Sequence, residues 1–188
     1  MKPADSKGFA STAVEVVHSW AMFRLLRRTV LGPRGDVFER TFVSTPGAVG
    51  VIALTSGNEI VLVSQYRSSF DGLVLEIPAG MRDVVGEDPT RTARRELAEE
   101  TGYEATTIEL LGSCLSSPGV TDSVVDLYIA RNIVAGESSP EGPEELEMKV
   151  LLVPFSRALS MVENGEITDS KSSVGILLTA RRYPDIGA

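Results

Sequence analysis

The chain has 188 residues, of which 43% are hydrophobic, and a formal net charge of −8. This length and composition predict one globular domain, or one domain with a small addition, that can bury a core. The acidic balance argues against a general nucleic-acid-binding protein, because such proteins carry a basic surface. An anionic ligand would need local arginines or bound cations to offset the field of the chain.

Cysteine and histidine each occur once, as Cys114 and His18. A single cysteine cannot form an internal disulfide, which favours a reducing, cytoplasmic setting. The counts also exclude a Cys/His zinc site. A Ser-His-Asp triad would have to use His18, but the chain has no G-x-S-x-G motif. We therefore expect His18 to be structural.

Membrane segments are not expected. No apolar run approaches the roughly 18 residues that span a bilayer, and residues 1–17 lack the apolar stretch of a signal peptide. The basic, partly apolar segment 23–34 could lie on a membrane surface. A strand followed by a turn is the favoured interpretation, so we expect a cytoplasmic protein without membrane or nucleic-acid partners.

The first half of the chain predicts mainly β structure after a loose terminus of about 12 residues. "SGN" at 56–58 is a turn signal between two apolar runs, which indicates a hairpin of largely buried strands. The expected elements are β-rich stretches at 14–31 and 37–43 around a turn at 32–36, the hairpin strands at 47–55 and 59–67, and a short strand at 73–80.

The second half predicts three strands, a polar loop and two closing helices, in addition to the helix considered next. The strands are expected at 106–116, 124–133 and 146–155, the loop at 136–145, and the helices at 156–165 and 170–183. This order predicts an α+β fold, a mixed or antiparallel sheet flanked by helices in α/β/α layers. We expect a small N-terminal β region at 1–44, with a role in dimerisation, and the main domain at 45–188.

The segment "GMRDVVGEDPTRTARRELAEETGY" predicts a helix with defined ends. Asp88 suits the N-cap, and Pro89 suits the first helical position, where its missing N–H costs nothing. Gly102 suits the left-handed residue beyond the C-terminus. The helix is therefore expected at 89–101.

Three carboxylates, Glu96, Glu99 and Glu100, crowd the end of this helix. Like charges at this spacing repel by roughly 0.2–0.5 kcal/mol per pair, and the helix dipole disfavours acidic residues at a C-terminus. A solvated acidic face is one interpretation. A site for a hard cation such as Mg²⁺, Mn²⁺ or Ca²⁺ is the other, because such ions prefer carboxylate oxygens.

The same segment resembles the Nudix box, G-x5-E-x7-R-E-U-x-E-E-x-G-U, in which U is a bulky aliphatic residue. Two departures are visible: six residues rather than five separate the first glycine from the first glutamate, and Tyr103 fills the last U position. The extra residue lies before the helix and should leave the carboxylates in place. The matching positions are Gly80, Glu87, Arg95, Glu96, Leu97, Glu99, Glu100 and Gly102.

The resemblance implies a loop-helix-loop that binds Mg²⁺ or Mn²⁺ and hydrolyses a substituted nucleoside diphosphate. Glu96 and Glu100 would be the principal metal ligands, with Glu99 a further or alternating one and the carbonyl of Ala79 another. An ion pair between Arg95 and Glu87 would fix the loop on the helix. Gly80 and Gly102 would serve as structural glycines of the box.

Features outside the box are similar to the ADP-ribose pyrophosphatases of this family. They are "SQYR" with Arg67, "LEIPAG" with Glu76, the later "GEITDSKSSVGILL", and Pro118, sixteen residues beyond Gly102. The resemblance implies that Arg67, Glu76 and Pro118 contact the substrate, although Arg67 could also be an ordinary surface residue. After the proline the chain has "PGVTDS", where Ser123 replaces a glutamate common in that group.

The catalytic base of that group usually lies in a loop before a late strand. Matching this loop points to Glu145, with Glu144 close behind; solvated acidic side chains are the alternative. With Glu99, these complete the candidate catalytic residues. The base would take a proton from the attacking water.

The resulting hypothesis is Mg²⁺-dependent hydrolysis of ADP-ribose to AMP and ribose 5-phosphate. The alternatives are a Nudix hydrolase of another nucleoside diphosphate sugar or a dinucleotide, and a non-catalytic ligand-sensing Nudix domain. The resemblance also implies a homodimer, with N-terminal strands that include Trp20 and Phe23 near the partner or the adenine.

Overall fold

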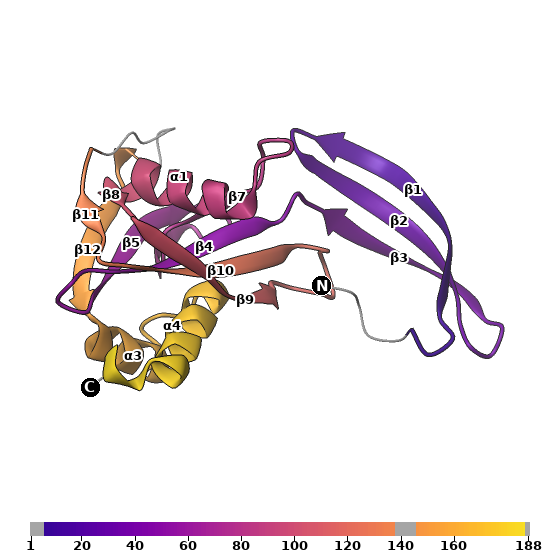
Figure 1. Cartoon of the computed structure of the whole chain (residues 1–188). Helices are drawn as coiled ribbons and strands as arrows, with labels where there is room; N and C mark the ends of the chain where they lie inside the picture. The colour runs from indigo at the N-terminus through magenta and orange to yellow at the C-terminus, as the bar shows by residue number, and fades with distance from the viewer. Residues whose placement is uncertain (1–5, 138–145, 187–188) are drawn as a thin grey trace. The chain divides into compact units, whose positions relative to one another are not determined.

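The computed structural model describes residues 6–137 and 146–186 (Figure 1). The chain divides into two compact units. The first comprises Met1–Pro46 with Ser117–Ser123, and the second comprises Gly47–Ser116 with Val124–Ala188. The sequence did not indicate that Ser117–Ser123 groups with the N-terminal strands.

The first unit is built on a three-stranded antiparallel sheet of β1 (Ala10–Trp20), β2 (Phe23–Leu31) and β3 (Val37–Ser44). The predicted β stretch at 14–31 is thus two strands, because the chain turns at Ala21, which has a φ of 47°. The predicted turn at 32–36 is confirmed: the Gly32 N–H donates to the Asp36 carbonyl at 2.8 Å. The segment 23–34 is a strand and turn, as favoured from its sequence.

Strand β1 is exposed along its whole length within the single chain. Its large apolar side chains include Val14, Val16 and Trp20, each at least 44% exposed. His18 stacks on Trp20 with ring centroids 5.6 Å apart. A long exposed edge strand is a template for pairing with another chain.

The second unit contains a seven-stranded mixed sheet with the order β12-β5-β4-β10-β9, to which β6 and β7 add by pairing with β5 and β4. Strand β10 runs parallel to β4, and the other pairs are antiparallel. The predicted strand at 73–80 divides into β6 and β7. The bounds are β4 (Ala48–Leu54), β5 (Glu59–Arg67), β6 (Gly72–Glu76), β7 (Ala79–Met81), β9 (Thr107–Leu115), β10 (Val124–Arg131) and β12 (Lys149–Pro154), with a separate pair of β8 (Tyr103–Glu104) and β11 (Val134–Ala135).

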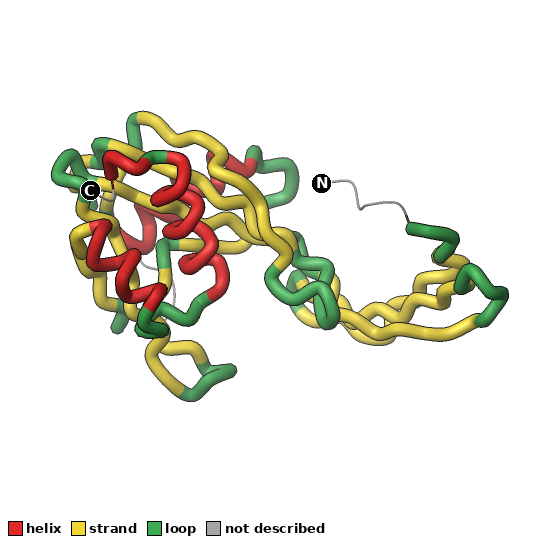
Figure 2. The backbone as a smooth tube through the Cα atoms, turned by 90° about the horizontal axis from the view of Figure 1, so that it is seen from below, coloured by secondary structure: helices red, strands yellow, loops and turns green. Residues whose placement is uncertain are grey.

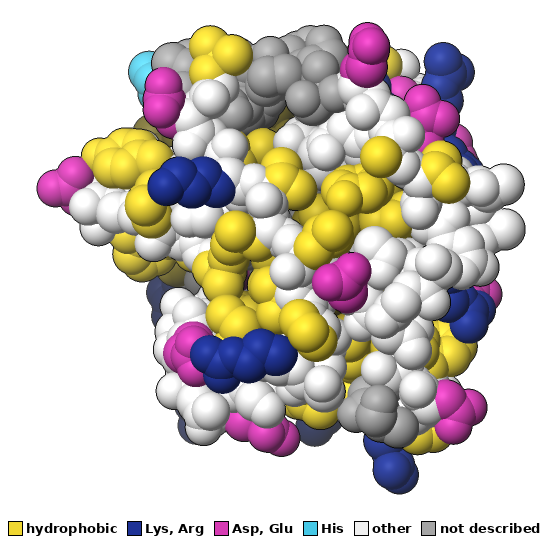
Figure 3. Space-filling model, turned by 90° about the vertical axis from the view of Figure 1, so that its left-hand side faces the viewer, with side chains coloured by type: hydrophobic (Ala, Val, Ile, Leu, Met, Phe, Trp, Pro, Cys, Tyr) yellow, Lys and Arg dark blue, Asp and Glu magenta, His cyan; other side chains and the backbone are white. Residues whose placement is uncertain are grey.

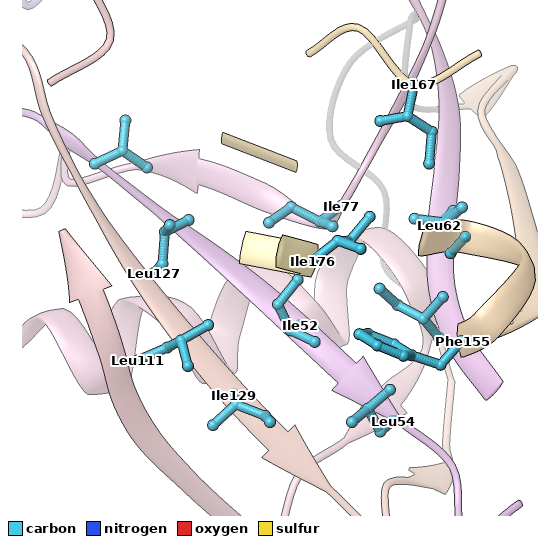
Figure 4. Close-up of a cluster of buried hydrophobic side chains, with 13 residues drawn as sticks. Ile52, Leu54, Leu62, Ile77, Leu111, Leu127, Ile129, Phe155, Ile167 and Ile176 are labelled. Carbon is cyan, nitrogen blue, oxygen red and sulfur yellow. The ribbon is translucent and has the colours of Figure 1, made fainter. Parts of the chain in front are cut away.

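Helices cover both faces of this sheet. Helix α1 (Pro89–Thr101) lies on one face, whereas α3 (Phe155–Glu163) and α4 (Ser170–Arg182) lie on the other (Figures 1 and 2). A short 3-10 helix, η1 (Pro184–Ile186), follows α4. Ala93 and Leu97 of α1 join one buried cluster, and Phe155 and Ile176 join the other (Figure 4). The expected α/β/α layers are confirmed.

The outer strand β12 pairs only with β5 among the described strands. It leaves Val150, Leu151 and Leu152 exposed by about 40% each. Figure 3 views the side on which β12 lies in Figure 1 and shows apolar side chains gathered on that face. Within 6–137 and 146–186, no helix has the length and apolar character needed to cross a membrane.

Candidate active site

Helix α1 has the ends that its sequence predicts. The Asp88 carboxylate accepts a hydrogen bond from the Thr90 N–H at 2.9 Å, and Pro89 opens the helix. Gly102 adopts a φ of 71° while its N–H donates to the Ala98 carbonyl at 2.8 Å. These caps fix where the last two turns, with their three glutamates, must lie.

The three carboxylates differ in burial. Glu100 is 6% exposed, the Glu96 side chain is 13% exposed, and that of Glu99 is 27% exposed. The Glu100 Oε2 accepts a hydrogen bond from the Ala79 N–H at 3.0 Å. The predicted ligand Ala79 is therefore brought to Glu100, and β7 is tied to the last turn of α1.

Gly80 lies directly against the Glu96 carboxylate. A Cβ atom on Gly80 would overlap the carboxylate carbon and both carboxylate oxygens. Only glycine gives the carboxylate this place beside the backbone of β7. The close approach explains why a glycine is needed at the start of the loop.

Arg95 bridges four carboxylates. Its Nη1 lies 2.9 Å from Glu96 Oε1 and 2.9 Å from Glu99 Oε2. Its Nη2 lies 3.4 Å from Glu87 Oε2 and 3.4 Å from Asp83 Oδ1. The predicted Arg95–Glu87 ion pair is present, but the sequence missed the contacts to the other three.

Burial raises the pKa of Glu96 to about 7, against an ordinary value of 4.5, with Arg95 opposing the shift and Glu99 and Asp83 adding to it. For Arg95, burial lowers the pKa, but Glu96, Glu99 and Glu87 outweigh it and raise the pKa overall. Burial and the neighbouring carboxylates thus outweigh the single Arg95 guanidinium and disfavour the charged form of Glu96.

The donor set at this helix end fits a hard divalent cation. Glu96, Glu99 and Glu100 offer carboxylate oxygens, and Gly80 leaves space for one of them beside the backbone. Across 6–137 and 146–186, no three His, Cys, Asp or Glu side chains already form a cluster able to hold a metal ion. The Arg95 guanidinium instead lies in contact with Glu96 and Glu99.

A pocket of about 580 Å³ contains Arg67, Phe70, Glu76, Asp169 and Lys171 among its lining residues. Arg67 donates two hydrogen bonds to the buried Glu76 carboxylate, at 2.7 and 2.8 Å. Lys171 Nζ contacts the same carboxylate and lies 3.0 Å from Asp169 Oδ2. Burial raises the pKa of Glu76, but Arg67 and Lys171 outweigh it and lower the pKa overall.

The pocket joins two predicted site residues with a cation that sequence reasoning missed. Lys171 lies 95 positions from Glu76 along the chain. The segment "ITDSKSS" could have indicated it, because Asp169 in this segment suits a helix N-cap. In the structure Asp169 caps α4 by accepting a hydrogen bond from the Ser172 N–H at 2.9 Å. The cap places Lys171 in the first turn of α4, next to Glu76.

Of the remaining predicted residues, the structure describes Pro118 but not Glu144 or Glu145. Pro118 belongs to the first unit, in a turn where the Val120 and Thr121 N–H groups both donate to the Ser117 carbonyl at 2.9 Å. Ser123 closes the same segment. Glu144 and Glu145 lie outside the described residues.

Comparisons with known proteins agree with this geometry. The family model described as "NUDIX domain" matches residues 44–173. The "ADP-ribose pyrophosphatase" of Bacillus subtilis (strain 168) is 35% identical over 176 residues, covering 94% of this chain and 93% of the relative. The "Methanol dehydrogenase activator" of Bacillus methanolicus is 38% identical over 162 residues, covering 86% and 87%.

A solved structure described as "Crystal structure of ADP compounds hydrolase" has the same fold. Its TM-score is 0.82 with 18% sequence identity, and the match covers 95% of this chain and 96% of that one. The chain therefore belongs to the NUDIX family. It is a Nudix pyrophosphohydrolase, and the resemblance to the ADP-ribose pyrophosphatase-like group is confirmed. Enzymes of this family use divalent metal ions.

Replacing Gly80 by alanine should lower kcat/KM at least tenfold, because the new methyl group would push the Glu96 carboxylate from its place. The fold should persist, since the displaced atoms end a flexible side chain. Gly57→Ala is the matched control, because a Cβ there would meet only Thr55 Oγ1 at 3.7 Å. Steady-state kinetics and thermal melting of both variants check this. Equal activity in the two variants would contradict the role of Gly80.

The metal-free protein should lose stability as the pH rises from about 4.5 to 7. Over this range folded Glu96 binds a proton more tightly than the unfolded chain does, so the contribution is full at low pH and is lost through pH 7. Partial solvent access reduces the loss to about 1–2 kcal/mol. Urea unfolding with a chelator should show this slope in the wild type but not in Glu96→Gln. If the free energy of unfolding varied with pH in the same way in the wild type and in Glu96→Gln, the prediction would be refuted.

Proposed function

We propose that this enzyme hydrolyses the diphosphate bond of ADP-ribose, with water, to AMP and ribose 5-phosphate. The similarity over 94% of the chain to a relative named for this activity is the observation that carries the proposal. The pocket beside Glu76 supports it, because Arg67 and Lys171 line it as cationic hydrogen-bond donors, each held by a neighbouring carboxylate.

Each part of the site has a proposed role. Glu96, Glu99 and Glu100 would hold Mg²⁺ or Mn²⁺, with the carbonyl of Ala79 as a further ligand. The bound ion would supply charge neutralisation at the diphosphate and make a coordinated water more acidic.

The remaining roles fall to side chains outside the last turn of α1. Arg67 would donate hydrogen bonds to diphosphate oxygens, while Glu76 holds its guanidinium. Pro118 would contact the substrate. Glu145, or else Glu144, would take the proton of the attacking water.

The test is a substrate panel with purified protein and Mg²⁺. ADP-ribose, other nucleoside diphosphate sugars and dinucleoside polyphosphates are compared by kcat/KM, with products separated by chromatography. ADP-ribose should give the highest value, with AMP and ribose 5-phosphate in equal amounts. A higher value for another compound would transfer the proposal to that substrate class. If no compound gave a product, both enzymatic proposals would fail and the non-catalytic, ligand-sensing Nudix domain would be the remaining alternative.

We further propose that the protein is a cytoplasmic homodimer in which residues 1–44 contribute to the interface. The exposed apolar length of β1, with Val14, Val16 and Trp20, supports a second copy as the partner. Sedimentation should give twice the chain mass of 20.1 kDa. Val16→Asp should shift the protein toward monomer. A wild-type monomer would refute the dimer without touching the proposed reaction.

A further inference from the structure

The two ends of the Arg95 guanidinium hold different kinds of carboxylate. Nη1 contacts Glu96 and Glu99, both proposed metal ligands, at 2.9 Å. Nη2 faces Asp83 and Glu87, which have no proposed ligand role, at the longer distance of 3.4 Å. The guanidinium is therefore held more closely on the side where a metal ion must bind.

A divalent ion at Glu96 and Glu99 would compete with Nη1 for the same carboxylates. Cations at such short range repel strongly where water is partly excluded, and the Arg95 side chain is 28% exposed. Metal binding should therefore loosen the Nη1 contacts. The cost of this step is set by the contacts that the guanidinium can gain elsewhere.

The Asp83 side offers such contacts. Charge-assisted N–H···O pairs close to about 2.7–2.9 Å, so both Nη2 distances can shorten. The Arg95 Nε is buried without a hydrogen-bond partner among the described residues, so the guanidinium is held only by the contacts of its two Nη groups. Glu87 already accepts from the Thr92 hydroxyl at 3.0 Å, which leaves Asp83, the more exposed of the two, freer to move toward Nη2.

We infer that Asp83 is a positioning residue for metal binding, which draws the Arg95 guanidinium away from Glu96 and Glu99 when a divalent ion occupies them. Asp83 is not a position of the Nudix box. It lies in the loop between Gly80 and Glu87 that is one residue longer than the box pattern. The inference rests on the metal site of the proposed function, but not on the identity of the substrate.

The test measures Mn²⁺ binding by calorimetry without substrate, at fixed pH and ionic strength. Asp83→Asn should raise the Mn²⁺ Kd about two- to fivefold, the upper part of the range for one partly exposed charge pair. Asp83→Glu, which keeps the charge, should stay within about twofold of the wild type. Thermal melting without metal should show all variants folded.

Arg95→Lys separates an effect through Arg95 from a simple loss of negative charge. A lysine ammonium is a single point charge and cannot bridge both carboxylate pairs as the guanidinium does. In this background Asp83→Asn should change the Kd by less than about twofold. If Asp83→Asn raised the Mn²⁺ Kd equally in both backgrounds, or did not raise it in the wild type, the role of Asp83 would be overturned while the proposed metal site would stand. No Mn²⁺ binding by the wild type would overturn it together with the proposed metal site.

Discussion

Replacing Glu100 by glutamine is expected to lower kcat/KM by about a thousandfold and to raise the Mg²⁺ concentration required for activity. Losing the charge of one proposed ligand removes about 4 kcal/mol of stabilisation where the ion acts. The fold should survive, because a glutamine oxygen can still accept the hydrogen bond from the Ala79 N–H.

Kinetics at varied Mg²⁺, together with direct Mn²⁺ binding, check this expectation. Glu163→Gln provides the control, since it makes the same change on an exposed residue at the end of α3. That variant should keep wild-type activity and metal dependence. Unaltered Mg²⁺ dependence in Glu100→Gln would remove Glu100 from the ligand set.

Replacing Glu145 by glutamine is expected to lower kcat by roughly 10²–10⁴-fold, the usual contribution of a general base. KM should stay within a few-fold, because the amide has nearly the same shape. The acidic limb of the pH–rate profile should also disappear, which a purely structural loss would not produce.

Glu144→Gln is the matched control for this position, one residue away in the segment that the sequence predicts to be a loop. It should retain most of the wild-type kcat. If Glu144→Gln is the defective variant instead, the base is Glu144. Full activity in both variants would remove the base from this loop.

Local chemistry made α1 predictable to the residue. Asp88, Pro89 and Gly102 start or end the helix through contacts within a few positions of their own place in the chain. The bounds of α1 can therefore be predicted without knowledge of the fold. The hairpin strands β4 and β5 were predictable for a related reason, because buried apolar runs mark them. The break between β1 and β2 was missed because Ala21, a residue without turn preference, carries the positive φ.

Contacts between distant segments could not be predicted from the sequence. The ion pair of Lys171 with Glu76 depends on how α4 docks against the sheet. The Arg95 contacts depend on which rotamer its long side chain adopts. Asp83, Glu96 and Glu99 stand at distances along the chain from Arg95 that would also allow them other partners. The box pattern led to the proposed ligand residues, but the structure was needed to show that Arg95 contacts two of them.

The division of the chain into interleaved units bears on how it is synthesised. The segment Ser117–Ser123 completes the first unit, where the Val43 N–H donates to the Val120 carbonyl at 2.8 Å and the Thr45 N–H to Asp122 Oδ1 at 3.0 Å. Strand β3 therefore leaves the ribosome more than 70 residues before the partners that finish it. Strand β4 likewise waits for β10, its parallel neighbour. The first unit cannot be completed on the ribosome before Gly47–Ser116 of the second has been made, and the second cannot be completed before the whole of the first. Nascent chains that stall before residue 124 would therefore expose unpaired strand edges.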